Sequence, residues 1–436
     1  MVGWRGRETP TEQLFRSERL ANRRKIMTSG LTKMYMTTGE VIRRVRRSLG
    51  MTQTELGAIL GYTQPAISQL EHGGSGVHDV RVLRRVAHAL HVPLSILVVE
   101  SDEEADVDRR NFFRAGALGG AGVAVTAAGS FGQAGAATGV KVGASDVAAI
   151  NASLNQIHEL DLIVGGDRLC RTAANEVRYV EQLLTTGTYS EETGRALASA
   201  GAEMMTAAGW VHYGAGRMDD ARHYYADAAQ SATAAGDGIA GAHALLNAGI
   251  VAFREGNRPR DGVNLTHAAQ RSAAKHGGPR LRALCAVREA EAQGAVSDTS
   301  SMASAVSRAH RAYDSARGHD PEWVYLPEAE LTGLTGLAFM RAGDHRQADT
   351  HLRSAIGGSK AWPREHWHWQ VHLARNYLAA GDVAASCALL SANLHTFKGL
   401  ASTRLDADIE GIARAVQPHH KVPEVKEFFE RRAAGI

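Results

Sequence analysis

The chain has 436 residues, which is enough for two or three domains, and its 44% hydrophobic and 22% charged residues are typical of a globular protein. A net charge of only +3 excludes a strongly polycationic chain, so any affinity for nucleic acid must come from a local basic surface. The three cysteines, Cys170, Cys285 and Cys387, stand far apart without metal-ligand spacing. They predict buried thiols in a cytoplasmic protein, without a disulfide framework or a metal.

Residues 1–36 are predicted to be a basic, disordered arm. The first 35 residues contain eight Lys or Arg against three Glu and show no hydrophobic periodicity. No apolar stretch follows the arginines, so a secretory signal is not expected. Alternatively, translation begins at Met34 or Met36, just before the first predicted helix.

Three short helices are predicted between residues 37 and 73. In the first, Ile42, Val45 and Leu49 recur at helical spacing and Gly50 ends the helix. Thr52 is expected to cap the second helix, whose inward residues are Leu56 and Leu60. Gly61 then supplies the left-handed residue that a tight turn between crossing helices needs.

The third helix is predicted to present a polar face to solvent. Thr63 is expected to cap it, Pro65 lies in its first turn, and Ile67 and Leu70 point inward. Its outer face holds short or amide-bearing side chains: Gln64, Ala66, Ser68 and Gln69. A glutamine amide can donate to and accept from adenine at the same time, and an alanine can contact a thymine methyl group.

The segment TQTELGAILGYTQPAISQLEHG, residues 52–73, resembles the helix-turn-helix domain of the lambdoid repressor and Cro type. The resemblance covers about residues 38–98 and implies a five-helix domain over residues 37–100. The predicted core is completed by Leu83, Val86, Ala87, Leu90, Leu94 and Leu97. The resemblance also implies that Gln53 binds the DNA backbone and that Gln64 and Gln69 read bases.

Two residues depart from this family pattern. Gly57 stands where the family usually has alanine, at an expected cost of about 1 kcal/mol in helix propensity. Pro65 is expected to change how deeply the third helix enters the groove.

Arg43, Arg44, Arg46 and Arg47 of the first helix are expected to face phosphates. The predicted DNA-binding residues are Arg43, Arg44, Arg47, Thr52, Gln53, Thr63, Gln64, Pro65, Ala66, Ser68 and Gln69.

Residues 101–144 are predicted to be a linker, first acidic and then rich in glycine and alanine. Arg109 and Arg110, followed by two phenylalanines, resemble a twin-arginine signal, although such signals act at the N-terminus. The uncharged run that follows is diluted by glycine and has few large side chains, so a membrane span is not expected. A flexible tether is favoured over a membrane anchor.

Residues 145–436 are predicted to be tetratricopeptide-like helical hairpins stacked into a right-handed α-solenoid, which makes the whole chain all-α. One unit has Gly209 at a close helix contact and Gly216 at the turn, with Ala221, Tyr225 and Ala228 along its second helix. The same plan returns at three later sets of residues: Gly249, Gly256 and Ala268; Gly336, Gly343, Ala348, Leu352 and Ala355; and Ala374, Gly381 and Leu390. A weaker unit at 279–316 lacks the turn glycine. Two or three helices are expected over 145–200, and VPEVKEFFERR near the end is expected to be a polar capping helix.

Together with ELDLIVGGDRL and DPEWVYLPEAEL, this arrangement is similar to Streptomyces-type regulators that join a repressor-like helix-turn-helix to tetratricopeptide repeats. That resemblance implies control of development, secondary metabolism or cell-cell signalling. At the level of architecture it is also similar to peptide-pheromone receptors of Gram-positive bacteria, in which a repeat domain binds a short peptide.

The first helix of each hairpin is expected to line the inner groove of such a solenoid. The candidate ligand-binding residues there are Trp210, Tyr213, His243, Asn247, Arg254, Arg288, Glu291, Arg341, His372 and Arg375. Amides can hold an extended peptide and arginine forks can clamp a carboxylate. The competing interpretation is that the aromatic residues only pack between repeats and that the arginines only form a solvent-exposed surface without a ligand. His366, His368 and His372 lie among tryptophans, but without an acidic partner at helical spacing they are not expected to bind a metal.

The sequence therefore predicts a cytoplasmic, sequence-specific regulator of transcription that binds double-stranded DNA. Its repeat domain is expected to form a homodimer, to sense a peptide or protein partner, or both. The alternative is a membrane-associated interaction scaffold that binds DNA incidentally. No catalytic motif is recognisable, so neither an enzyme nor a cofactor is expected.

Overall fold

The computed structural model describes residues 37–97, 141–164, 166–315, 319–321, 323–324, 326–394 and 403–434. Within these ranges the chain is helical, without a β-strand, and a single isolated bridge joins Lys141 to Thr188. The predicted all-α class is therefore confirmed. The predicted arm and the twin-arginine-like segment at Arg109 and Arg110 lie outside the described residues.

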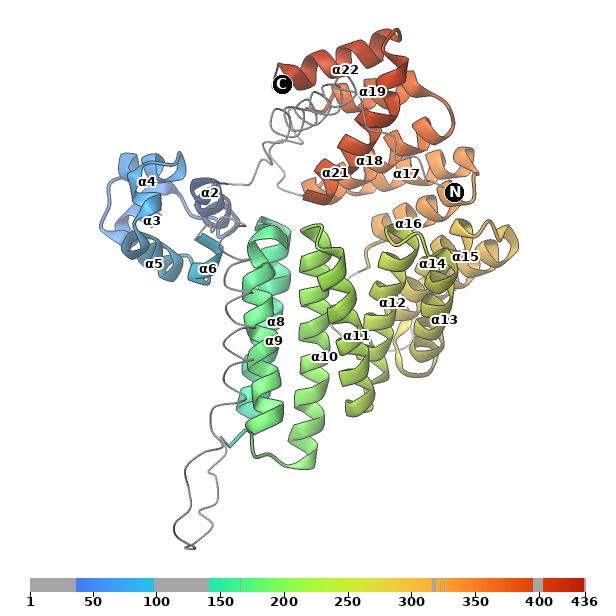
Figure 1. Cartoon of the computed structure of the whole chain (residues 1–436). Coiled ribbons are helices and arrows are strands. Elements are labelled where there is room, and N and C mark those ends of the chain that lie inside the picture. Colours follow the sequence, from blue (N-terminus) through green and yellow to red (C-terminus); the bar gives the residue numbers. More distant parts are fainter. Residues whose placement is uncertain are drawn as a thin grey trace, which may run out of the picture. The chain divides into compact units, whose positions relative to one another are not determined.

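Five α-helices and one short 3-10 helix form the first described region (Figure 1). They are α2 (Thr38–Ser48), α3 (Gln53–Leu60), α4 (Gln64–Glu71), η1 (Ser75–His78), α5 (Val80–Ala89) and α6 (Leu94–Leu97). The five predicted helices are thus all present within residues 37–97.

The ends of α3 follow from its sequence. The Thr52 hydroxyl accepts a hydrogen bond from the backbone N–H of Glu55 at 3.2 Å, and the Glu55 carboxylate accepts one from the backbone N–H of Thr52 at 2.7 Å. This capping box satisfies two N–H groups at the start of the helix. Gly61, at φ 71°, ends α3 in the predicted left-handed conformation.

The start of α4 was predicted correctly in position but not in detail. Thr63 occupies the N-cap with extended dihedral angles, and Pro65 lies in the first turn, where its missing N–H costs no hydrogen bond. The Thr63 side chain, however, makes no capping hydrogen bond, so that part of the prediction is wrong.

The core of this domain joins all its helices. The residues with relative exposure of 5% or less include Val41, Ile42, Val45, Leu56, Leu60, Ile67, Leu70, Leu83, Val86, Ala87, Leu90, Ile96 and Leu97. Two predictions need correction. Leu49 is 48% exposed because α2 ends at Ser48, and Leu94 is only half-buried because Ile96 takes the inward position of α6.

The second region is a series of helices, most of which pack against the next helix in the chain (Figure 1). They are α8 (Ala144–Val164), α9 (Gly166–Thr186), α10 (Glu191–Gly214), α11 (Met218–Ala235), α12 (Gly238–Arg254), α13 (Pro259–His276), α14 (Pro279–Ala295), α15 (Thr299–Tyr313), α16 (Glu328–Arg341), α17 (His345–Gly358), α18 (Pro363–Ala379), α19 (Val383–Ser391), α21 (Thr403–Val416), η2 (Gln417–His419) and α22 (Pro423–Ala433). However, α16 packs against α14, and α22 packs against α19.

Five hairpins repeat along this region, from α10 with α11 to α18 with α19. The first helices of successive hairpins also contact one another, as α10 does with α12 and α12 with α14. The five predicted hairpins are therefore present, including the weaker one at residues 279–316. Its turn without glycine passes through Ser297, which takes a positive φ of 61°.

Small residues set the spacing inside the hairpins, as the sequence predicts. A Cβ atom added at Gly209 would lie 2.5 Å from the ring of Tyr225, and one at Gly336 would lie 2.9 Å from Leu352. Only glycine permits these helices to approach so closely. In the second hairpin, Ala268 was predicted as the small residue at the helix contact, but this prediction is wrong by one residue. Ala269 is fully buried there, whereas Ala268 is half-buried.

The last helix closes the hydrophobic core at the C-terminal end. Val425 and Phe428 of α22 are fully buried in a cluster with Leu390 and Ile412, while most of the helix is polar. This agrees with the predicted capping helix, since a repeat array needs a polar outer surface at its ends.

Candidate functional site

The outer face of α4 is exposed, as the sequence predicts. Gln64, Pro65 and Gln69 are exposed, whereas Ile67 and Leu70 are buried against the rest of the domain. Ala66 and Ser68 are half-buried between these two faces. The helix therefore presents amide and small side chains on the surface away from the core.

A chain of hydrogen bonds connects this surface to the core. The Gln64 amide donates to Gln53 Oε1 at 2.5 Å, and the Gln53 amide donates to Glu71 Oε2 at 2.8 Å. Glu71 in turn accepts two hydrogen bonds from Arg46, at 2.5 and 3.1 Å. These four side chains, which we call the amide relay, come from three helices and fix the position of Gln64 relative to α2 and α3.

The amide relay corrects the role predicted for Arg46. This side chain does not face phosphate, because it is only 5% exposed and pairs with the buried carboxylate of Glu71. Burial would raise the pKa of Glu71, but hydrogen bonds from Arg46 and Gln53 outweigh burial and lower it. Glu71 therefore stays ionised and keeps accepting from both groups.

The remaining predicted phosphate contacts lie on α2 and at the start of α3. Arg47 is exposed, and Arg43 and Arg44 are half-buried. Gln53 is half-buried and committed to the amide relay, and the Thr52 hydroxyl is shared with Glu55. Residues 38–97 contain seven arginines against four acidic residues, so this domain carries a local positive excess.

In the repeat domain, four of the predicted groove residues meet at one carboxylate. Glu291 is completely buried and accepts from both Nε and Nη2 of Arg254, at 2.8 and 2.7 Å. It also accepts from Arg288 at 3.1 Å and from Arg341 at 3.0 Å. We call this group the Glu291 cluster. It joins α12, α14 and α16.

The Glu291 cluster holds more positive than negative charge. Three guanidinium groups surround one carboxylate, and they hold the pKa of Glu291 well below its usual range even though burial acts in the opposite direction. The nearest further carboxylate, Glu330, lies 4.0 Å from Arg288. Burial, followed by the charge of Glu365, raises the pKa of Glu330 to about 7, so it offsets the excess only in part.

Trp210 and Tyr213 contribute to packing. Tyr213 is 1% exposed, and its hydroxyl donates to Glu255 at 3.3 Å. The Arg404 guanidinium of α21 lies 5.4 Å from the Trp210 ring centroid and 5.1 Å from that of Tyr213. These cation-π contacts join α21 to α10.

The other predicted groove residues form separate local contacts. Asn247 is 6% exposed and donates to the backbone carbonyl of His243 at 3.0 Å. Arg375 pairs with Asp408 at 2.7 Å. His372 is 6% exposed, and among the described residues neither of its ring nitrogens has a hydrogen-bond partner. Burial, with His368 close by, lowers its pKa well below the usual value, so this ring is neutral.

The sequence analysis missed several residues that complete contacts with the predicted groove residues: Glu203, which pairs with His243, and Glu255, Glu330, Arg404 and Asp408. Glu203 interrupts a run of apolar or small residues, and such an isolated acid on a buried helix is a signal for a paired carboxylate. Glu330 follows Glu328 in the first turn of α16, where acidic residues are common, so it gives a weaker signal. Arg404 offers no comparable signal, because it lies in an ordinary polar stretch far along the chain from the rings that it contacts.

The histidine-rich segment brings His368 and His372 together with ring centroids 4.4 Å apart. In the parts of the chain that the structure describes, no three His, Cys, Asp or Glu side chains gather as metal ligands would. None of the described helices is both long and apolar enough to cross a membrane.

These features define a helix-turn-helix DNA-binding domain joined in one chain to a series of helical hairpins. The helix-turn-helix family model matches residues 42–97, which includes α3 and α4 in full. A search of curated proteins found no match. Among solved structures, the chain is similar to Bacillus thuringiensis PlcR in complex with the peptide PapR7 and DNA, at 12% sequence identity and a TM-score of 0.26, over 64% of this chain and 94% of that chain.

Proposed function

We propose that this protein is a sequence-specific regulator of transcription, acting in the cytoplasm as a binding protein and not as an enzyme. The observation that carries the proposal is the exposed face of α4, where Gln64 is held by the amide relay while Gln69 extends into solvent. A recognition helix needs side chains that can pair with base edges and whose positions are fixed before binding.

Gln64 has the chemistry for reading a base. One of its amide N–H groups donates to Gln53, which leaves the second N–H and the carbonyl oxygen on an exposed side chain. A donor and an acceptor on one planar group match adenine N7 and N6 in the major groove. Arg43, Arg44 and Arg47 would supply the contacts to phosphate that set the register.

We further propose that the helical hairpins sense a peptide or protein partner. The Glu291 cluster supports this role, because its excess of guanidinium groups suits a carboxylate from a partner. Arg341 is the most accessible member, at 22% side-chain exposure, whereas Arg254 and Arg288 are at 8%. A peptide would therefore meet Arg341 first.

The regulator is proposed to act as a homodimer. A single helix-turn-helix contacts few base pairs, and two half-sites on one face of the duplex multiply the discrimination between sequences. Light scattering of the free protein and footprinting of the complex would test this proposal together. A monomer bound to a single, non-palindromic half-site would refute it.

Gel shifts at several salt concentrations test the DNA-binding role. Gln64→Ala and Gln69→Ala are expected to reduce the preference for the selected operator by about 1–3 kcal/mol each, with little change on unrelated DNA. Arg47→Ala is expected to weaken binding to every sequence and to lower the slope of log K against log salt by about 1.

Matched controls for these variants lie on the repeat domain. Gln182→Ala removes an exposed amide from α9, and Arg311→Ala removes an exposed positive charge from α15. Both are expected to leave operator affinity unchanged. If Gln64→Ala and Gln182→Ala behave alike, α4 is not the recognition helix.

A further inference from the structure

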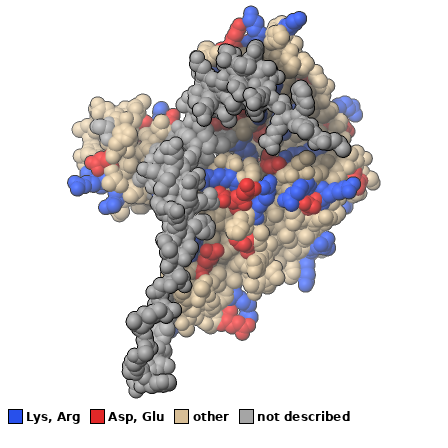
Figure 2. All heavy atoms as spheres, in the orientation of Figure 1, with Lys and Arg blue, Asp and Glu red and all other residues tan. Residues whose placement is uncertain are grey.

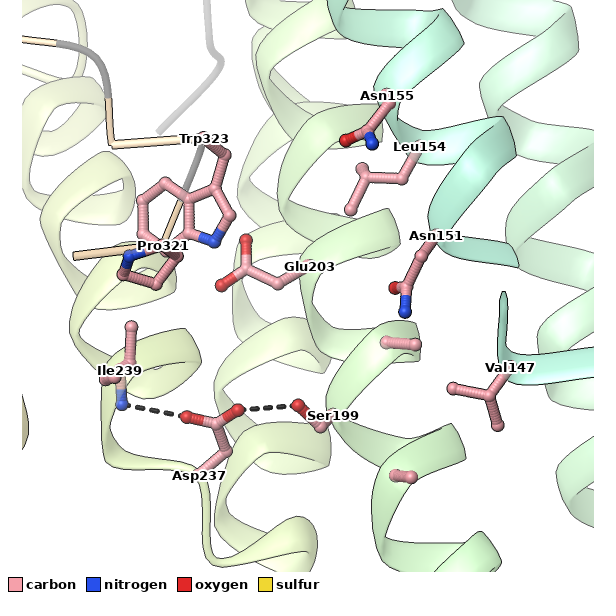
Figure 3. Close-up of a pocket in the computed structure, with 12 residues that line it drawn as sticks. Val147, Asn151, Leu154, Asn155, Ser199, Glu203, Asp237, Ile239, Pro321 and Trp323 are labelled. Atoms are coloured by element: carbon pink, nitrogen blue, oxygen red, sulfur yellow. Dashed lines mark hydrogen bonds between the residues drawn. The ribbon is translucent and has the colours of Figure 1, made fainter. Parts of the chain in front are cut away.

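A cavity of about 440 Å³ lies in the N-terminal part of the repeat domain (Figure 3). It is enclosed by α8, α10, the start of α12 and the segment that contains Pro321 and Trp323. Apolar side chains make up much of the wall, and Asn151 and Asn155 lie at the exposed edge on α8. A volume of this size suits a small organic molecule or one large side chain of a partner.

The cavity contains an incompletely paired carboxylate. Glu203 of α10 is 8% exposed and lines the cavity, with its carboxylate directed towards the Trp323 side (Figure 3). Its Oε2 accepts a hydrogen bond from His243 Nδ1 at 2.7 Å. Its Oε1 is buried and has no hydrogen-bond partner among the described residues. A buried carboxylate oxygen without a donor is costly, so a ligand that supplies a donor would be stabilised here.

The second carboxylate at the cavity is already satisfied. Asp237 accepts from the backbone N–H groups of Ile239 and Ala240 at 2.9 and 3.0 Å, and from the Ser199 hydroxyl at 2.5 Å. It therefore caps the start of α12, and its acceptors are already used. Glu203 remains the group with an open acceptor.

The described residues that line the cavity include two carboxylates, Glu203 and Asp237, and no lysine or arginine. The basic partner nearest Glu203 is the His243 imidazole, which is bonded to Oε2 and not to Oε1. His158 is close enough to interact with Glu203, but burial, followed by the charge of His243, lowers its pKa. The open oxygen of Glu203 is an acceptor in a wall without lysine or arginine, so the cavity favours a ligand with a donor or a positive charge over an anion.

Trp323 adds an aromatic wall beside the acid. Its ring stacks on the His243 ring with a centroid distance of 4.0 Å and an interplanar angle of 11°. This stack fixes the imidazole that donates to Glu203, and Trp323 also lines the cavity. A cation next to an indole is favoured over one next to an aliphatic wall.

We propose that this cavity binds a primary ammonium group carried on a small apolar body. The ammonium group donates to Glu203 Oε1, the apolar body lies against the hydrophobic wall, and Asn151 and Asn155 bond to any polar group at the edge. The cation comes either from a free amine or from the amino group of a peptide. Any effect of this ligand on transcription rests on the proposed function, but binding itself does not.

Calorimetry on the full-length chain tests the site with three compounds of similar shape. 2-Phenylethylamine is expected to bind at least tenfold more tightly than 2-phenylethanol or 3-phenylpropanoate. The tripeptide Phe-Gly-Gly, with and without an N-acetyl group, distinguishes a peptide source from a free amine. Equal binding of the amine and the alcohol, or no binding of any amine, overturns the proposal.

Three variants locate the binding. Glu203→Gln keeps the shape of the side chain and is expected to weaken amine binding at least tenfold, whereas Glu192→Gln, an exposed change on the same helix, leaves it unchanged. Glu203→Gln keeps an oxygen that can accept from His243 and removes the buried charge, so its unfolding midpoint without ligand is expected to stay close to that of the wild type. Ala196→Leu, at an exposed position of the cavity wall, is expected to block binding without loss of charge. Amine binding that persists in both Glu203→Gln and Ala196→Leu refutes the site.

Gel shifts on the same preparations separate this inference from the proposed function. Loss of operator binding with intact amine binding would refute only the regulator. Absence of amine binding with intact operator binding would refute only the cavity site.

Discussion

The Glu291 cluster gives the sharpest prediction about stability. Glu291→Gln keeps the size of the side chain and removes its charge. The three arginines then face one carbonyl oxygen and one amide NH₂ group where they had two carboxylate oxygens. The carboxylate is fully buried, and Arg254 and Arg288 are at 8% side-chain exposure, so water cannot replace what is lost.

The magnitude follows from the hydrogen bonds. Four bonds of 2.7 to 3.1 Å connect Glu291 to its three partners, and a glutamine retains an acceptor for only some of them. Removing one partner of a buried ion pair costs about 3–5 kcal/mol, because the remaining charges stay buried without compensation. We expect Glu291→Gln to lower the free energy of unfolding of the repeat domain by about 4 kcal/mol.

Denaturation in urea followed by tryptophan fluorescence measures this loss. Five of the six tryptophans lie between residues 210 and 369, and none lies within residues 38–97, so the signal reports mainly on the repeat domain. The control is Glu191→Gln, which breaks the exposed pair with Arg195 and is expected to cost less than about 0.5 kcal/mol. A loss below about 1 kcal/mol for Glu291→Gln would show that the cluster behaves like a surface ion pair and would refute the reasoning.

Two further predictions concern pH and helix packing. Because the pKa of Glu330 is raised from 4.5 to about 7, the folded state binds more protons than the unfolded state between these values, and stability falls as pH rises through this window. Glu330→Gln is expected to remove the contribution of Glu330 to that fall, which is on the order of 2 kcal/mol between pH 5 and pH 8. Urea titrations of wild type and variant at both pH values measure it. The same pH dependence in both proteins would contradict this prediction. Gly57→Ala is expected to lower the melting temperature of the helix-turn-helix domain, measured by circular dichroism. The added Cβ atom would lie 2.6 Å from the Tyr62 carbonyl oxygen, and this strain outweighs the gain of about 1 kcal/mol in helix propensity. A higher melting temperature would mean that the backbone shifts at little cost.

The helices and their inward faces were predictable because they follow from local spacing. The capping box at Thr52, the left-handed Gly61 and the buried Ile67 of α4 all depend on residues within a few positions of one another. The glycine at position 209 was predictable for a related reason, since its partner Tyr225 lies at a fixed offset in the same hairpin.

The partners of charged side chains were not predictable, because they depend on contacts distant in sequence. Arg46 pairs with Glu71 across 25 positions, and Arg341 reaches Glu291 across 50. Periodicity predicts Arg46 beside the exposed arginines of its helix, yet α4 packs against α2 and brings Glu71 to it. Gly57 was misjudged for a different reason: propensity alone suggested a cost, whereas the turn after α3 brings the Tyr62 carbonyl close to it and requires glycine.

Charged side chains of both signs gather beside one another on the face of the molecule drawn in Figure 2. A binding surface of this kind selects partners by the position of individual charges, because opposite charges nearby cancel any broad field. For this reason the proposed peptide and ammonium ligands are each assigned to named groups, and not to the net charge of the domain.

Selection of bound DNA from a random oligonucleotide pool at physiological salt tests the central claim most directly. The wild-type protein is expected to enrich one motif, and the Gln64→Ala, Gln69→Ala double variant is expected to lose preference at the positions that α4 reads while keeping its affinity for unselected DNA. Enrichment of the same motif by both proteins, or of no motif by the wild type, would contradict the account.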